Sequence, residues 1–364
     1  MKVGWISSRS YREPTGIGTY SRQLISELLR QGVDGSLVGA SVEIDDWSPG
    51  PASSPLAIPK NRLLHRFLAP LALRKRELDL LHFLTIHEIY YTNMRPTRTL
   101  VTIHGFGALH LPRPLHESMS GWARKKYRHL LARMDRIIAV SESTKKDLIQ
   151  FFDLNPERIA VVYHGVDQRF RPLQGFKNGR PKTLDQRPFI LAVGATIPKK
   201  NIVGVLRALS LLEKREIAVR LVHAGPNGWG RAEILAELGR LRLGEDVEFR
   251  GRVTSDELVA LYQEASLLCF PSWHEGFGMP ILEAMACGCP VVTSNAHAMP
   301  EISGDAAILV NPADPAEIAS GVERLLTDGD LRKQLVRKGL QRAAEFSWAQ
   351  CSGETLDIYR QAFR

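Results

Sequence analysis

Short apolar segments alternate with amphipathic segments along most of the chain. The apolar segments are rich in β-branched residues, as in KVGWIS, TLVTIH, RIIAVS, FILAVG and PVVTS. The segment GTYSRQLISELLRQG, residues 18–32, instead repeats its apolar residues at helical spacing, and Gly32 can end that helix. Strands that are apolar on both faces and alternate with helices predict parallel sheets covered by helices. The predicted fold class is therefore α/β, with two doubly wound, Rossmann-like domains that face each other across a cleft.

A stretch rich in Gly, Pro and charge separates two sets of these segments. It reads RPLQGFKNGRPKTLDQR and is typical of a linker. We predict an N-terminal domain over residues 1–172, a linker over 173–186 and a C-terminal domain over 187–346. A last helix over about 347–364 is expected to pack back on the N-terminal domain. The 364 residues suffice for two cores.

Cysteine usage and apolar run lengths indicate the compartment. The four cysteines lie mostly in or beside apolar segments, and no paired Cys-x-x-Cys motifs suggest zinc. We expect reduced thiols. No apolar run approaches secretory or membrane-spanning length. A cytoplasmic location is therefore expected.

The positive charge is concentrated in the first half of the chain. Residues 1–180 contain 27 Lys/Arg and 16 Asp/Glu, a net charge of +11, whereas the rest has 21 and 23, a net charge of −2. A basic surface fits nucleic acid, anionic lipid or phosphorylated substrates. No nucleic-acid-binding module is present in the sequence, so no nucleic-acid partner is expected.

Two basic segments, RLLHRFLAPLALRKR and WARKKYRHLLARM, mix Lys and Arg with apolar residues at loosely helical spacing. One interpretation is two ordinary amphipathic helices with solvated basic faces. The other is a surface that rests on anionic lipid, at the inner face of a membrane.

The segment SWHEGFGMPILEAMACGCPVV, residues 272–292, contains the most distinctive chemistry. Glu275 is predicted in a loop after a strand, and Glu283 in the first turns of a helix that Gly288 ends. Glycines 276 and 278 let backbone N–H groups approach a ligand, and a helix N-terminus favours a phosphate. The carboxylates suit sugar hydroxyls. These features point to a nucleotide sugar.

At this point the sequence resembles a known family, the retaining glycosyltransferases of family 4. EGFGMPILE matches the family's signature of two glutamates separated by seven residues, and PEISGDAAILVNPADPAEIA extends the match. TGIGTYSRQL resembles the N-terminal glycine loop of the family, and VGATIPKKN resembles its phosphate-binding loop. The resemblance covers nearly the whole chain and implies the architecture called GT-B.

The resemblance implies roles for individual residues. In the C-terminal domain, Glu275 would contact the transferred sugar, Glu283 the nucleotide ribose, and Lys200 the diphosphate. The implied donor-binding set also contains Lys199, Arg252, Val253, Gly276, Phe277 and Gly278. The family's cationic residue after the first loop glycine is absent, since Ala195 follows Gly194.

The N-terminal domain would contribute backbone N–H groups at Gly16 and Gly18 and a histidine, His104, near the transferred sugar. The family commonly has aspartate after this histidine, whereas this chain has Gly105. The sequence therefore does not show what orients the imidazole.

The reaction implied is the transfer of a sugar, with mannose from GDP-mannose as the best match, to an acceptor hydroxyl on a saccharide or lipid-linked saccharide. No metal and no cofactor are expected. The Asp-Gly-Asp at 328–330 is interpreted as a helix stop and the next N-cap. Two alternatives are a nucleotide-sugar epimerase on the same fold and a non-enzymatic basic protein that binds nucleic acid or lipid.

Overall fold

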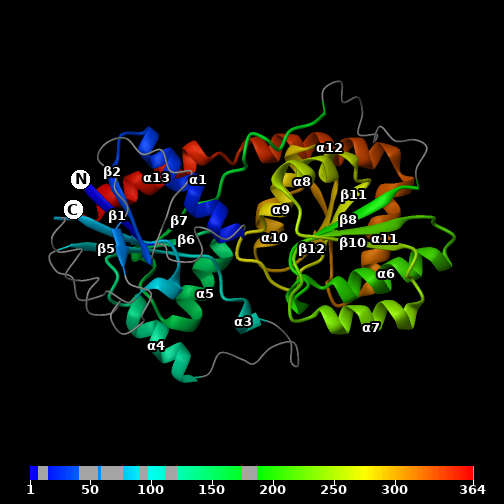
Figure 1. The fold of residues 1–364 in the computed structure, drawn as a ribbon, viewed down its shortest axis with the longest axis horizontal. Helices are drawn as coiled ribbons and strands as arrows, with labels where there is room; N and C mark the ends of the chain where they lie inside the picture. The colour runs from blue at the N-terminus through cyan, green and yellow to red at the C-terminus, as the bar shows by residue number, and fades with distance from the viewer. Residues whose placement is uncertain are drawn as a thin grey trace. The chain divides into compact units, whose positions relative to one another are not determined.

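The computed structural model describes residues 1–6, 15–40, 56–58, 77–89, 97–110, 121–173 and 187–363 (Figure 1). Of the linker predicted over 173–186, only the first residue is described. The chain forms two compact units. Unit 1 comprises Met1–Phe106, Met119–Gly165 and Ser347–Arg364, and unit 2 comprises Gly107–Ser118 and Val166–Phe346.

Unit 1 is built on a parallel sheet with the strand order β3-β2-β1-β4-β5-β6-β7. The central strands are apolar on both faces and buried, which explains why a parallel arrangement covered by helices suits them. The strands are β1 (Lys2–Ile6), β2 (Asp34–Ala40), β3 (Leu56–Ile58), β4 (Leu80–Phe83), β5 (Arg98–Ile103), β6 (Arg136–Ala139) and β7 (Ile159–Val161).

Helices of unit 1 pack in pairs. The helix α1 (Gly16–Arg30) contacts the last helix, α13 (Trp348–Gln361), and α4 (Gly121–Leu131) contacts α5 (Glu142–Phe152) (Figure 1). The helix predicted over 18–32 corresponds to α1, and Gly32 after its end has a φ of +78°. Two 3₁₀ turns, η1 (Ile86–Glu88) and η2 (Pro156–Arg158), complete the described elements.

Unit 2 has a second parallel sheet, with the order β10-β9-β8-β11-β12-β13. Its strands are β8 (Phe189–Val193), β9 (Arg220–Ala224), β10 (Val247–Gly251), β11 (Leu267–Phe270), β12 (Val291–Ser294) and β13 (Ala307–Val310). Both units thus have the doubly wound, Rossmann-like α/β fold that the sequence predicts.

The helices of unit 2 pack against one another around two of their members. The helix α6 (Ile202–Lys214) contacts α7 (Arg231–Leu241) and α11 (Pro315–Thr327) (Figure 1). The helix α9 (Met279–Ala286) contacts α8 (Ser255–Glu264), α10 (Ala298–Ser303) and α12 (Gly329–Ala344), and α11 also contacts α12. The turn η3 (Pro198–Lys200) and the short helix α3 (Gly107–His110) also belong to unit 2. In the described part of the chain, no helix is long and apolar enough to span a bilayer.

The apolar segments quoted above all contain strands, whereas β2 does not follow from the apolar pattern. Its sequence, DGSLVGA, has few β-branched residues and two glycines. Gly35 pairs near Trp5, and a Cβ on Gly35 would lie 2.2 Å from the Trp5 ring. The glycine therefore makes room for a fully buried tryptophan on the neighbouring strand, and this weakens the sequence signal for a strand.

A buried polar network joins the C-terminal helix to the core of unit 1. The Tyr359 hydroxyl of α13 accepts a hydrogen bond from Trp5 Nε1 at 3.1 Å and bonds to His82 Nδ1 at 2.7 Å. The other ring nitrogen, His82 Nε2, bonds to the Thr102 hydroxyl at 2.7 Å, which also bonds to the Tyr20 hydroxyl at 2.9 Å. Burial lowers the pKa of His82 to about 3, so the imidazole is neutral.

This network makes the Tyr359 hydroxyl important for stability. Tyr359→Phe would leave the Trp5 N–H and one His82 nitrogen without their buried partner, which costs about 2–4 kcal/mol. We expect this loss in the free energy of unfolding from urea denaturation. Gln361→Ala, at an exposed position on the same helix, should change it little. Equal stability of Tyr359→Phe and the parent chain would show that the network contributes nothing.

Candidate functional site

Two lysines and a glutamate meet at the carboxyl ends of neighbouring strands of unit 2. Lys199 and Lys200 end the η3 turn after β8, and Glu275 follows β11, which pairs with β8. Lys200 Nζ donates to Glu275 Oε1 at 2.7 Å, and Lys199 Nζ donates to Oε2 at 3.4 Å. The structure thus brings together three residues that the sequence analysis selected separately.

Burial strengthens the electrostatics of this group. The side chains of Lys200 and Glu275 are 13% and 11% exposed. Burial opposes ionisation of Glu275, but the charges of Lys199 and Lys200 outweigh it and lower the pKa of Glu275 to about 2. Burial also lowers the pKa of Lys200, against the attraction of Glu275. Separating Glu275 from the lysines would leave buried charges uncompensated. An anion that enters must therefore take the place of the Glu275 carboxylate beside the lysines.

The backbone after β8 has two unusual positions that shape the lysine turn. Gly194 has a φ of +127°, and a Cβ there would lie 2.8 Å from Lys200 Cε, so glycine lets the lysine side chain cross the backbone. Asn201 has a φ of +55°. Its amide nitrogen donates to the carbonyls of Pro271 at 3.0 Å and Pro312 at 2.8 Å. Asn201 thereby ties the lysine turn to two other loops, a role that the sequence analysis missed.

A glycine is needed between the two glutamates because the chain turns there. Gly278 has a φ of +107° and forms the N-cap of α9. Residues other than glycine rarely adopt this backbone conformation, so Gly278 sets the direction in which the helix leaves the Glu275 loop. Gly276 and Phe277 are buried beside it, and the Phe277 ring contacts Phe346 at a centroid distance of 6.1 Å.

Glu283 lies on α9 in a different environment from Glu275. Its Oε2 accepts a hydrogen bond from the Tyr262 hydroxyl at 2.9 Å. Burial, helped by the charge of Asp167, raises the pKa of Glu283 to about 7, although Tyr262 and Lys200 oppose the shift. Lys200 therefore acts electrostatically on both glutamates. Tyr262 is a second residue that the sequence analysis missed.

Arg252 and Val253, predicted near the nucleotide base, follow β10 at the edge of the sheet. Arg252 is exposed and Val253 half-buried. Within the described residues, no hydrogen bond or ion pair joins either residue to Lys200 or Glu275. Their role in donor binding stays a prediction.

His104 follows β5 in unit 1, and the structure shows what orients its ring in place of an aspartate. His104 Nε2 donates to the Leu84 carbonyl at 2.9 Å, and the ring meets Tyr20 edge-on at 4.8 Å. Burial lowers the pKa of His104 to about 4. The hydrogen bond to Leu84 raises this pKa, and the charge of His87 lowers it further. The imidazole is therefore neutral, with the hydrogen on Nε2 and the lone pair on Nδ1.

The glycine segment of unit 1 is a helix start. Gly16 and Gly18 lie in the first turn of α1, and Thr15 is its N-cap. The Thr15 hydroxyl accepts from the Gly18 N–H at 3.2 Å. Helix capping therefore uses the Gly18 N–H in this structure, and the role of Gly16 and Gly18 in donor binding stays a prediction.

Acidic residues elsewhere serve as helix caps. Asp328 accepts from the backbone N–H groups of Asp330 and Leu331 at the start of α12, as the sequence predicted. Within the described ranges, no group of three or more His, Cys, Asp or Glu side chains could hold a metal ion.

Family models of known proteins match both parts of the chain. The family model described as "Glycosyltransferase Family 4" matches residues 14–170, and that described as "Glycosyl transferases group 1" matches residues 176–342. The chain belongs to glycosyltransferase family 4. This family 4 protein is accordingly an enzyme that transfers glycosyl groups, which confirms the resemblance noted in the sequence.

Individual relatives support this assignment. O-antigen chain mannosyltransferase B of Escherichia coli is 28% identical over 95% of this chain and 96% of its own. MMP alpha-(1->4)-mannosyltransferase of Mycolicibacterium hassiacum is 32% identical over 69% of this chain and 59% of its own. Sucrose-phosphate synthase from Thermosynechococcus elongatus has the same fold, with a TM-score of 0.83 at 20% identity over 100% of this chain and 99% of its own.

The raised pKa of Glu283 predicts a pH effect on the stability of this family 4 enzyme. Because the folded pKa of about 7 exceeds the ordinary 4.5, the protonated carboxyl stabilises the fold below about pH 4.5. That contribution is lost as the pH rises through 7. Glu283→Gln, which cannot ionise, should be as stable as the parent chain at pH 4.5 and more stable at pH 8.5, by about 2–3 kcal/mol.

Chemical denaturation over this pH range measures the effect. Glu264→Gln, at an exposed position of α8, is the matched control and should follow the parent chain at every pH. Parallel pH profiles for Glu283→Gln and the parent chain would mean that Glu283 is not held in its neutral form.

Proposed function

We propose that this glycosyltransferase moves mannose from GDP-mannose to an acceptor hydroxyl on a growing glycan or lipid-linked saccharide, with retention at the anomeric carbon. The observation that carries the proposal is the buried group of Lys199, Lys200 and Glu275 beside Glu283. Positive charge for a diphosphate and carboxylates for hydroxyls lie together there, at the carboxyl edge of a parallel sheet where ligands of such folds bind.

The lysines have a chemical role in this proposal. As the bond between the sugar and the diphosphate breaks, negative charge grows on the leaving phosphate, and a fixed ammonium such as Lys200 stabilises it. The leaving phosphate accepts the proton of the attacking acceptor hydroxyl on the same face of the sugar. No pair of carboxylates is then needed as acid and base, unlike in a glycosidase.

Glu275 has a second role in the same step. Since its carboxylate already neutralises both lysines, a bound diphosphate would compete for their ammonium groups. Glu275 would then be released toward the hydroxyls of the sugar that follows the diphosphate. The lysines provide the charge that a divalent ion would otherwise provide, so we propose that transfer does not require metal.

The choice of mannose is supported by the relatives. The Escherichia coli and Mycolicibacterium hassiacum proteins are both named mannosyltransferases. The guanine base is the part of this proposal that rests only on the likeness of ATIPKKN and PSWHEGFGMP to such enzymes.

A panel of nucleotide sugars examined by calorimetry tests the proposal. We expect GDP-mannose to bind more tightly than UDP-glucose, and EDTA to leave transfer unchanged. Lys200→Ala should weaken the binding of GDP by about 1.5–3 kcal/mol, because a charged hydrogen bond is lost, and should lower turnover further.

Lys214→Ala is the matched control, since Lys214 is exposed at the far end of α6. It should bind GDP like the parent chain. An absence of any nucleotide-sugar binding, or activity that a divalent ion restores after chelation, would contradict the proposed donor or the proposed mechanism. Release of free nucleotide without an acceptor would favour the epimerase alternative.

The acceptor side of the proposal concerns α4 in unit 1. Of the residues on this helix, Trp122 is 73% exposed, and Arg124, Lys125 and Lys126 are also exposed. Lys126 Nζ lies 5.4 Å from the centre of the Trp122 ring. A basic helix with an exposed tryptophan suits an anionic membrane surface, which would bring the enzyme to a lipid-linked acceptor. The other basic segment, with Arg74, Lys75 and Arg76, lies outside the described residues.

Vesicle co-sedimentation tests this part. We expect binding to anionic vesicles at low salt and none to neutral vesicles. Each Lys or Arg side chain near an anionic surface contributes about 1 kcal/mol, and salt screens the attraction. Replacing Arg124, Lys125 and Lys126 by Ser should abolish most of the binding. Replacing Lys214, Lys333 and Arg337 by Ser removes the same charge from unit 2 and should not. An equal loss of vesicle binding in both triple variants would show that the net charge of the protein, and not α4, determines the binding.

A further inference from the structure

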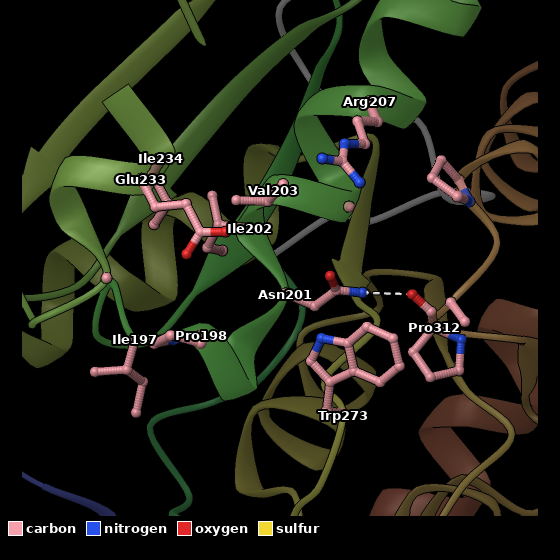
Figure 2. Close-up of a pocket in the computed structure, with 14 residues that line it drawn as sticks. Ile197, Pro198, Asn201, Ile202, Val203, Arg207, Glu233, Ile234, Trp273 and Pro312 are labelled. Carbon is pink, nitrogen blue, oxygen red and sulfur yellow. Dashed lines mark hydrogen bonds between the residues drawn. The ribbon is translucent and has the colours of Figure 1, made fainter. Parts of the chain in front are cut away.

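A cavity of about 140 Å³ lies in unit 2 where α6 begins (Figure 2). It is bordered by the η3 turn, the first turns of α6 and α7, Trp273 and the loop that precedes α11. None of the residues predicted to bind the donor lines it. The cavity is therefore a feature that the proposed transfer reaction does not use.

Asn201 presents an acceptor to this cavity. Both hydrogen bonds of its side chain run from the amide nitrogen to carbonyl oxygens, those of Pro271 and Pro312. The nitrogen must therefore face these carbonyls, and Oδ1 points the other way, into the space shown in Figure 2. Asn201 is only 6% exposed, and its Oδ1 accepts no hydrogen bond from the described residues. This oxygen is not among the fully buried unpartnered atoms of the described chain, so it is accessible from the cavity and can accept a hydrogen bond from a ligand or a water.

Donors lie opposite this oxygen. The Arg207 guanidinium points toward Asn201 in Figure 2, and among the described residues only its Nε is engaged, by Glu237 Oε1 at 2.6 Å. The first N–H groups of α6 add further donors, because the side chain of its N-cap residue makes no capping bond. A ligand with hydroxyl groups can use both the acceptor and these donors.

The remaining wall is partly acidic and partly apolar. Glu233 reaches from α7 toward Ile202, and the Trp273 indole lies below Asn201 (Figure 2). Glu237 pairs with Arg207, and Glu233 adds a carboxylate to the wall, so the cavity does not favour a strongly anionic ligand. An aromatic face beside hydroxyl-binding groups suits a ring that has both C–H and O–H faces.

The volume of the cavity indicates the size of the ligand. A volume of 140 Å³ is several times the ~30 Å³ that one water occupies in the liquid, but well below the ~300 Å³ at which drug-sized sites begin. This volume matches a single ring better than a whole nucleotide.

We propose that this cavity binds a single neutral hexose ring, separately from the donor site. The ring would donate a hydroxyl hydrogen to Asn201 Oδ1, accept from Arg207, and rest against Trp273. Either a free sugar or the end of a glycan could supply the ring. The proposal does not depend on which nucleotide sugar the enzyme uses.

The cavity is connected to the lysine turn. The backbone N–H of Trp273 donates to the Lys199 carbonyl at 2.8 Å, and Asn201 directly follows Lys200. A ring held by Asn201 and Trp273 would fix the loops that carry Lys200 and Glu275. Sugar binding and nucleotide binding should therefore be coupled, and by the same factor in both directions.

Ligand-detected NMR with methyl α-D-mannoside, in the presence of saturating GDP, tests the proposal. We expect weak binding, with a Kd on the order of 1–10 mM for so small a ligand. Val203→Phe fills the cavity and should weaken binding at least about tenfold. Leu235→Phe, an exposed position on α7 outside the cavity, is the matched control and should bind normally.

A second comparison separates the cavity from the donor site. Arg207→Gln removes a donor to the ring and should weaken sugar binding more than Glu275→Gln, which acts only through the coupled loops, whereas the exposed control Arg324→Gln should leave it unchanged. Sugar binding that Glu275→Gln abolishes and Val203→Phe preserves would place the ring in the donor site and overturn the proposal, as would the absence of binding by the parent chain. Binding that is sensitive to Val203→Phe in a chain that binds no nucleotide sugar would support the cavity and refute only the proposed donor.

The length of the saccharide distinguishes the two sources of the ring. A mannose disaccharide that binds more tightly than the monosaccharide indicates the end of a glycan, and equal affinity indicates a free sugar. Either result is compatible with the cavity as a hexose site.

Discussion

The contact between Lys200 and Glu275 is the interaction on which the site depends. Both side chains are largely buried, so each needs the other to offset the loss of water. The contact requires that the loops after β8 and β11 adjoin, and the direct pairing of these strands ensures this. A ligand that enters must therefore exchange one set of charge interactions for another, which selects anions that carry hydrogen-bonding groups beside the charge.

Three backbone positions make this contact possible. Gly194 lets the Lys200 side chain cross the chain, Asn201 fixes the turn through two carbonyls, and Gly278 starts α9 after the Glu275 loop. Each lies at a positive φ, where most side chains are strained. The site is thus positioned by backbone geometry, and the charged residues occupy places that this geometry creates.

The sequence predicted the sheets, because strands leave local signals. Apolar runs identify the strands, and the two glutamates with glycines between them identify the loop that is predicted to bind the donor. The pairing of Glu275 with Lys199 and Lys200 left no such signal, since the residues lie about 75 positions apart. The same holds for His104, whose ring is oriented by the carbonyl of Leu84, a backbone group that any residue provides. The capping of Gly18 by Thr15 also left no clear signal, because a glycine in a helix start looks like one in a ligand loop.

Glu275 and Glu283 show how far a motif determines chemistry. They are the same residue type, both largely enclosed, and eight positions apart, yet the pKa of one is lowered to about 2 and that of the other raised to about 7. The difference follows from neighbours: two ammonium groups contact Glu275, whereas Glu283 has a tyrosine hydroxyl and lies near the charge of Asp167. Glu275 is consequently a permanent anion, which limits the net positive charge of the lysine turn. Glu283 can change its charge near neutral pH, so the protonation of the predicted ribose contact depends on the conditions in which the donor binds.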